Sequence, residues 1–175
     1  MNKKFFSLLA ALLVSALITS TASAGGAVKL FGATFRLGSL IAIGTFTGLG
    51  GYSQGVTAEL VASGFLVVTC TNQNGNQAPG QNPPQISVNG EQIVGPQGIT
   101  RKGTAPMNVT AEPGPITGTQ GGCPNDHWTA QIDFVFWTNA AISVRDTATG
   151  ALLLQQDYNC TTTRDPDSVS CTAVP

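Results

Sequence analysis

His127 is the only histidine of the chain, and it lies in the run Asn125-Asp126-His127-Trp128. An aspartate beside a histidine can orient the imidazole as a general base, and a serine nucleophile would complete a hydrolase. No serine of the sequence stands in the G-x-S-x-G pattern that exposes a nucleophile on a tight turn. We therefore expect no catalytic residue, and His127 is most simply interpreted as a loop histidine at the entry to a strand.

Other catalytic and metal-binding patterns are equally weak. Glycoside hydrolysis needs two facing carboxyl groups, but Glu59 and Asp133 fall on the polar faces of their expected strands, as solvated acids do. The sequence contains no C-x-x-C pair and a single histidine, which disfavours a zinc site. Asp165 and Asp167 flank a proline but lack the rest of a calcium-binding loop. We expect neither a metal nor a cofactor.

Two features could serve binding. Residues 70–84 carry no charge and are rich in amides, which both donate and accept hydrogen bonds and so suit hydroxyl-rich ligands. The alternative is that these amides cap the backbone of their own loop. Trp137 lies opposite the expected core face of its strand, where an exposed indole stacks on a sugar ring or anchors a partner, unless a second layer covers it. The candidate ligand-binding residues are Trp137, Asn74, Asn76, Gln77, Gln81 and Asn82.

The four cysteines are Cys70, Cys123, Cys160 and Cys171, and their even number favours two disulfides in an oxidising compartment. A hairpin centred on Asp165-Pro166 would place residues whose numbers sum to 331 opposite each other, which pairs Cys160 with Cys171. Directly opposed strand residues have Cβ atoms about 4.5–5.5 Å apart, close to what a disulfide needs. This assignment leaves Cys70 to pair with Cys123.

The first 24 residues predict export. Lys3 and Lys4 precede an apolar run over residues 5–18, and Ala22-Ser23-Ala24 is typical of a signal-peptide cleavage site. The remaining part, residues 25–175, keeps six of the eight basic residues and all nine acidic ones, so its net charge is 6 − 9 = −3. The cations are scattered, which disfavours nucleic acid as a partner. No later run is long enough to predict a membrane span.

The elements that would position these residues are strands. Period-two alternation over residues 28–46, 56–62, 65–71, 107–111, 128–137, 141–146 and 152–160 predicts half-buried strands, and no segment shows a helical period. Turns are expected at Ser63-Gly64, Asn89-Gly90 and Thr138-Asn139. We predict an all-β, antiparallel immunoglobulin-like β-sandwich of about seven to nine strands in a single domain, with a small β-barrel as the alternative.

The same parity predicts which face of each strand is buried. For the first strand the expected core face is Phe31, Ala33, Phe35, Leu37, Ile41 and Ile43. For the strand over residues 128–137, the expected core face is Trp128, Ala130, Ile132, Phe134 and Phe136. Val135 and Trp137 are then expected on the opposite face.

Three stretches resemble a group of uncharacterised secreted bacterial proteins. They are the segment that starts Gly44-Thr45-Phe46, the segment from Cys70-Thr71-Asn72 through Asn76-Gln77-Ala78-Pro79-Gly80-Gln81-Asn82-Pro83, and Cys123-Pro124-Asn125 followed by Trp128. The resemblance covers roughly residues 44–145, and the Asn-Gln-Ala-Pro-Gly-Gln-Asn-Pro run is its most specific part. It implies export and a small protein. It implies no activity and no functional residue.

These observations favour a secreted, non-catalytic β-sandwich with a structural or binding role outside the cell or at its surface. A carbohydrate-binding module that uses Trp137 and the amide-rich loop is the second hypothesis, and a small secreted hydrolase built on His127 is the third. The expected partner is a glycan or another protein chain outside the cell, and no membrane span is expected once the signal peptide is removed.

Overall fold

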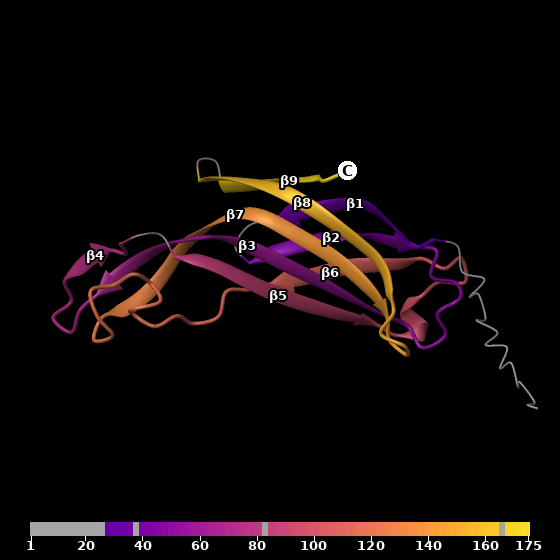
Figure 1. The fold of residues 1–175 in the computed structure, drawn as a ribbon, viewed down its shortest axis with the longest axis horizontal. Helices are drawn as coiled ribbons and strands as arrows, with labels where there is room; N and C mark the ends of the chain where they lie inside the picture. Colours follow the sequence, from indigo (N-terminus) through magenta and orange to yellow (C-terminus); the bar gives the residue numbers. More distant parts are fainter. Residues whose placement is uncertain (1–26, 37–38, 82–83, 165–166) are drawn as a thin grey trace, which may run out of the picture.

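The computed structural model describes residues 27–36, 39–81, 84–164 and 167–175, so the expected signal peptide lies outside the described residues. The described residues form nine β-strands and one turn of 3-10 helix, η1 (Pro96–Gly98), and contain no α-helix. Figure 1 shows two layers of strands that run mostly along the long axis of the molecule. The sequence-based prediction of an all-β chain is confirmed.

One sheet has three strands in the order β1-β2-β6: β1 (Lys29–Arg36), β2 (Leu40–Thr47) and β6 (Ala105–Ala111). The other sheet has six strands and is built around β3, which pairs with β7 along one side and with both β4 and β5 along the other. Strands β8 and β9 follow β7 in the same sheet. Its strands are β3 (Val56–Thr71), β4 (Gln77–Pro79), β5 (Gln85–Val94), β7 (Thr129–Asp146), β8 (Leu152–Arg164) and β9 (Asp167–Ala173).

The topology is that of an immunoglobulin-like sandwich. The order β5-β3-β7-β8 matches strands C′, C, F and G of such a fold, and β1-β2-β6 matches strands A, B and E. Every strand pair in the described residues is antiparallel, and both sheets end in edge strands, so neither sheet closes on itself. The predicted antiparallel immunoglobulin-like β-sandwich is confirmed.

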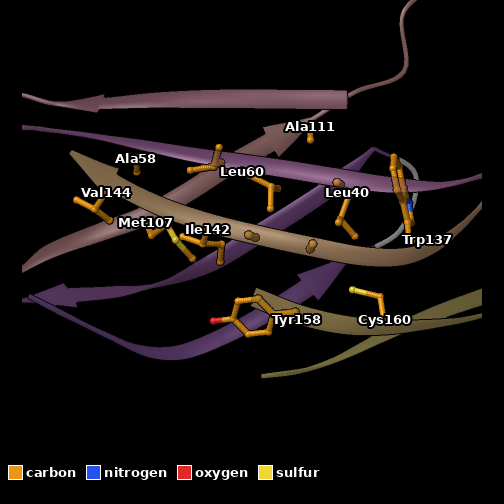
Figure 2. Packing of buried hydrophobic residues seen from close by; sticks show 14 of the residues in the cluster. Leu40, Ala58, Leu60, Met107, Ala111, Trp137, Ile142, Val144, Tyr158 and Cys160 are labelled. Atoms are coloured by element: carbon orange, nitrogen blue, oxygen red, sulfur yellow. The ribbon is translucent and has the colours of Figure 1, made fainter. Parts of the chain in front are cut away.

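The core lies between the two sheets (Figure 2). Leu40 and Met107 of the three-stranded sheet and Leu60, Trp137 and Ile142 of the six-stranded sheet are each at most 1% exposed. The described residues include no buried polar or charged side chain. Burial of this apolar area is the main favourable term in folding, and it carries little desolvation penalty from polar groups.

Strand β7 corrects the predicted core face around Trp137. Its pairing with β3 shifts by one residue at Asp133, opposite Val67 and Val68, and again at Thr138. Each β-bulge inserts one extra residue and reverses which side chains face the core. Val135 and Trp137 are therefore buried, whereas Phe134 and Phe136 lie on the outer face and are only partly buried. The prediction that Val135 and Trp137 lie opposite the core face of their strand is wrong.

Two expected turns are strand interiors, and the expected turn at Thr138-Asn139 is the second bulge of β7. β3 continues through Ser63-Gly64, and a Cβ atom on Gly64 would lie 2.3 Å from the carbonyl oxygen of Phe136. β5 continues through Asn89-Gly90, where a Cβ atom on Gly90 would lie 1.8 Å from the carbonyl oxygen of Thr110 in β6. Both glycines permit close approach of another strand rather than a change of direction.

The N-terminal region is a hairpin rather than one long strand. β1 and β2 pair with each other, and the pairing is irregular between Phe31 and Thr34. In β2 the buried residues are Leu40, Ala42 and Phe46, so the predicted inward face of Ile41 and Ile43 is wrong. Phe31 is 56% exposed, while Phe35 packs edge-to-face on Tyr158 of β8 with ring centroids 5.0 Å apart. The predicted core residue Leu37 lies outside the described residues.

Candidate functional site

The candidate site lies where β3 and β7 extend beyond the neighbouring strands. Figure 1 shows this end at the left of the molecule, with β4 and the loop that precedes β7 gathered around it. We call it the stapled end and define it as residues 70–81 and 116–130. Cys70 is the penultimate residue of β3. It pairs with Ala78 of β4 and Ala130 of β7, and its sulfur is bonded to that of Cys123.

Both predicted disulfides are confirmed. Cys70 is bonded to Cys123 across 53 residues, and Cys160 to Cys171 across 11. The latter two residues are direct partners in the β8–β9 ladder, whose register follows the predicted sum of 331. The hairpin centre, residues 165 and 166, lies outside the described residues.

Glycines bring the two loops of the stapled end into direct backbone contact. The backbone N–H of Gln81 donates to the carbonyl of Gly122 at 2.9 Å, and that of Gly80 donates to Val68 at 2.8 Å. A Cβ atom would lie 2.1 Å from the Gln81 oxygen if placed on Gly122, and 2.6 Å from the Ala130 Cβ if placed on Gly121. Any larger side chain would separate the loops, so the disulfide and the glycines together make them one packed unit.

The amide-rich loop partly caps itself, as one of the two interpretations predicted. The side-chain oxygen of Asn72 accepts from the backbone N–H groups of Asn74 and Asn76 at 3.0 and 2.9 Å. The candidate side chains of Asn74, Asn76 and Gln77 point outward and are exposed. The Gln81 amide donates to Pro79 at 3.5 Å, and Asn82 lies outside the described residues. The loop thus offers three amides on a fixed backbone.

Residues 117–128 form a second ordered loop. Thr117 and Gln120 exchange backbone-to-side-chain hydrogen bonds at 2.9 and 3.2 Å. The carboxylate oxygen Oδ1 of Asp126 accepts from both the backbone N–H and the hydroxyl of Thr119. These bonds, first the hydroxyl and then the N–H, lower the pKa of Asp126 below 3.8, with a smaller contribution from His127; desolvation opposes the shift. Asp126 is therefore ionised at neutral pH.

A shallow groove of about 480 Å³ lies beside this loop. Trp128, which is half-buried, forms part of its wall at the entry to β7. The other side chains that line it include Ile116, Thr117, Thr119, Asp126 and Thr129. Trp128 packs against the core cluster, as predicted, but it also lines this groove, which the sequence reasoning did not foresee. The available signal was the short run from Asp126 to Thr129, which begins three residues after the disulfide cysteine Cys123.

His127 does not assemble a catalytic site in the described residues. Its side chain is exposed, and its backbone N–H donates to Asn125 Oδ1 at 3.0 Å. Among the described residues, no hydrogen bond is formed by the imidazole of His127. Oδ1 of Asp126 accepts its hydrogen bonds from Thr119. The Asp126–His127 pair therefore lacks the geometry in which a carboxylate orients a general base toward a nucleophile.

Another groove, of about 310 Å³, brings Glu112 and Asp133 to the same side of the sandwich. Both carboxylates are exposed, and Asp133 Oδ2 accepts from the Thr69 hydroxyl at 2.6 Å. Asp133 is therefore an exposed acid, as the sequence analysis expected.

Trp137 belongs to the core and not to a ligand site. Its side chain is 1% exposed and lies among the buried hydrophobic residues (Figure 2). Its backbone N–H donates to the Thr162 hydroxyl at 2.9 Å, and that hydroxyl donates to the Trp137 carbonyl at 3.1 Å. The indole Nε1 has no hydrogen-bond partner among the described residues. An indole enclosed in this way cannot stack on a sugar ring, which corrects the sequence-based candidate.

The described residues contain no group of three or more metal-ligating side chains. In the same part of the chain, no helix has the length and apolarity needed to cross a membrane.

No protein-family model matches the chain, and no curated protein matches it. Among solved structures, the chain is similar to a Bacteroides uniformis β-glucuronidase, with 13% identity and a TM-score of 0.26. It is also similar to Bacteroides uniformis β-glucuronidase 2 covalently bound to cyclophellitol-6-carboxylate aziridine, with 14% identity and a TM-score of 0.26. The matches cover 78% and 79% of this chain but only 13% of each of those chains. Such identities and TM-scores support no conclusion about activity or ligand.

Proposed function

We propose that this chain is a secreted, non-catalytic β-sandwich that binds a partner outside the cell through its stapled end. The observation that carries the proposal is the fusion of two polar loops by the Cys70–Cys123 disulfide and by glycine contacts. A preorganised surface loses little conformational freedom when it binds, which favours affinity. The exposed amides of Asn74, Asn76 and Gln77 supply hydrogen-bonding groups on that surface.

Export is supported by cysteine usage. All four cysteines form disulfides, and such bonds persist mainly in oxidising compartments outside the cytosol. The expected signal peptide at residues 1–24 points the same way. A non-catalytic role is supported by the surroundings of His127: its side chain is exposed, and Oδ1 of the neighbouring Asp126 accepts hydrogen bonds from Thr119.

The test is binding to the outer surface of the producing cells. The labelled protein, with both disulfides intact, is titrated onto cells that lack the gene, and the bound fraction is measured by flow cytometry. One variant replaces Asn74, Asn76 and Gln77 with serine. A matched control variant replaces three exposed amides on the outer sheet face with serine: Gln85, Asn89 and Gln155.

Saturable binding that is lost in the stapled-end variant and kept in the control variant is the expected result. Equal binding by both variants, or no saturable binding by the unmodified protein, would overturn the assignment. Turnover of a chromogenic ester or glycoside that disappears in His127→Ala would overturn the non-catalytic part of the proposal.

A further inference from the structure

The groove beside Trp128 combines an apolar ring with hydrogen-bonding groups that are held in place. The half-buried indole lies next to the Asp126 carboxylate and the hydroxyls of Thr117, Thr119 and Thr129. Its volume of about 480 Å³ falls within the range of about 300–1,000 Å³ that small-molecule sites occupy. A ligand for this groove needs one apolar face and several hydroxyl donors.

The charge of the groove further limits which ligands could bind. No lysine or arginine is among the described residues that line it, and Asp126 is its one charged group. Hydrogen bonds from Thr119 keep this carboxylate ionised and fix its Oδ1 atom, while Oδ2 has no hydrogen-bond partner in the described residues. A free carboxylate oxygen accepts from a hydroxyl and repels an anion. The ligand is therefore neutral rather than acidic.

The backbone around the groove is fixed before any ligand arrives. The N–H of Trp128 donates to Asn125 at 3.2 Å, and the N–H of Cys123 donates to Gly118 at 2.9 Å. A Cβ atom on Gly118 would lie 2.4 Å from the carbonyl oxygen of Trp128, so the two loop segments are in direct contact. The Cys70–Cys123 disulfide ties the same loop to β3. The backbone positions of Trp128 and Asp126 are consequently held relative to each other.

We propose that this groove is a subsite for one pyranose ring of a neutral glycan. The indole of Trp128 stacks on the C–H face of the ring, and Asp126 Oδ2 with the threonine hydroxyls bonds to the sugar hydroxyls. A pyranose has the required combination, because one face presents C–H groups while its rim presents hydroxyls. The inference rests on the proposed binding function and names the ligand class of the stapled end.

The test measures affinity by titration calorimetry for three neutral hexasaccharides, cellohexaose, mannohexaose and the fully N-acetylated chitohexaose, with hexagalacturonate as the acidic probe. The chain has two tryptophans, which makes a matched pair of variants possible. Trp128→Ala removes the proposed stacking ring, and Trp137→Phe alters the indole that is buried in the core. Asp126→Asn removes the negative charge but keeps a side-chain oxygen that can accept the hydrogen bonds from Thr119. It is therefore the second variant, to be used if Trp128→Ala fails to fold.

At least one neutral hexasaccharide is expected to bind. We expect affinity to fall by at least about tenfold in Trp128→Ala and by several-fold in Asp126→Asn, as for central binding residues. Trp137→Phe should change it by less than about twofold, because the change is confined to a side chain that the ligand cannot reach. Binding of hexagalacturonate as tight as that of the neutral sugars would overturn the inference. So would equal loss in Trp128→Ala and Trp137→Phe.

The failure of this inference is distinguishable from failure of the proposed function. If none of the three neutral hexasaccharides binds while the protein still saturates the cell surface through Asn74, Asn76 and Gln77, the pyranose subsite is wrong and the binding function stands. If neither assay shows saturable binding, both are wrong.

Discussion

Gly90 offers the most direct test of how the two sheets are joined. It lies inside β5, and an added Cβ atom would be 1.8 Å from the carbonyl oxygen and 2.5 Å from the carbonyl carbon of Thr110 in β6. Two residues further along β5, Gln92 Oε1 accepts from the Asn108 N–H at 2.8 Å, and its Nε2 donates to Pro106 at 3.4 Å. β5 thus closes one side of the sandwich against β6.

The cost of Gly90→Ala follows from this geometry. A methyl group needs well over 3 Å from an oxygen atom, so β5 and β6 must separate by more than about 1 Å to accept it. Such overpacking costs about 1–3 kcal/mol, and loss of the Gln92–Asn108 hydrogen bond adds about 1 kcal/mol. The free energy of unfolding should fall by about 2–4 kcal/mol. At about 2–4 °C per kcal/mol for a domain of this size, the melting temperature should fall by about 4–16 °C.

Urea denaturation followed by circular dichroism, with calorimetry for the melting temperature, measures the effect. Gly114→Ala is the matched control, since no heavy atom lies within 4 Å of its added Cβ, and we expect a change within about 0.5 kcal/mol. Gly90→Asn discriminates further. A turn glycine with positive φ tolerates asparagine better than alanine, whereas a packed strand glycine tolerates it worse. If Gly90→Asn were more stable than Gly90→Ala, or if Gly90→Ala matched Gly114→Ala, the packing argument would be refuted.

Three other predictions concern the two disulfides, the hydrophobic core and the groove beside Trp128. Replacing Cys70 and Cys123 by serine should cost about 4 kcal/mol, and replacing Cys160 and Cys171 about 3 kcal/mol, because the chain-entropy term grows with the 53- and 11-residue separations; urea denaturation that gave the reverse order would contradict it. Trp137→Ala should destabilise the fold by about 3–5 kcal/mol, as for other large core residues, and a cost below 1 kcal/mol would show that the side chain is not enclosed. Thr119→Ala should return the pKa of Asp126 toward 3.8 in an NMR titration. Because the lowered pKa of the folded state stabilises the protein above pH 3.8 and that stability is lost as pH falls through the folded value, the variant should lose less stability on acidification.

The features that could be predicted from sequence are those set by local pattern. The predicted strand over residues 56–62 has no bulge of its own, so its inward set Val56, Ala58, Leu60 and Ala62 follows directly from parity. The terminal disulfide could be assigned because hairpin symmetry about one turn fixes which residues face each other. Pairing of the other two cysteines then followed by elimination.

The features that could not be predicted depend on contacts between distant segments. Gly64 and Gly90 have the local sequence pattern of turns. Each is nevertheless a strand residue that must be glycine, because a strand remote in sequence approaches it too closely for a side chain. The neighbouring strand therefore determines whether a glycine forms a turn or allows two strands to approach closely. The position of a bulge is equally non-local, since it depends on how two strands of different lengths share a ladder.

The bulge at Asp133 decides which tryptophan is available for binding. Without it, the parity that places Ala130 and Ile132 toward the core would continue to Phe134 and Phe136 and leave Trp137 on the surface. Asp133 is itself the inserted residue, and its carboxylate accepts from the Thr69 hydroxyl of the facing strand at 2.6 Å, which holds the insertion in place. Asp133, which the sequence predicts to be an ordinary solvated residue, is thus the insertion that places Trp137 in the core. Trp128, which lies before the insertion at the junction of loop and strand, is left as the indole that lines a groove.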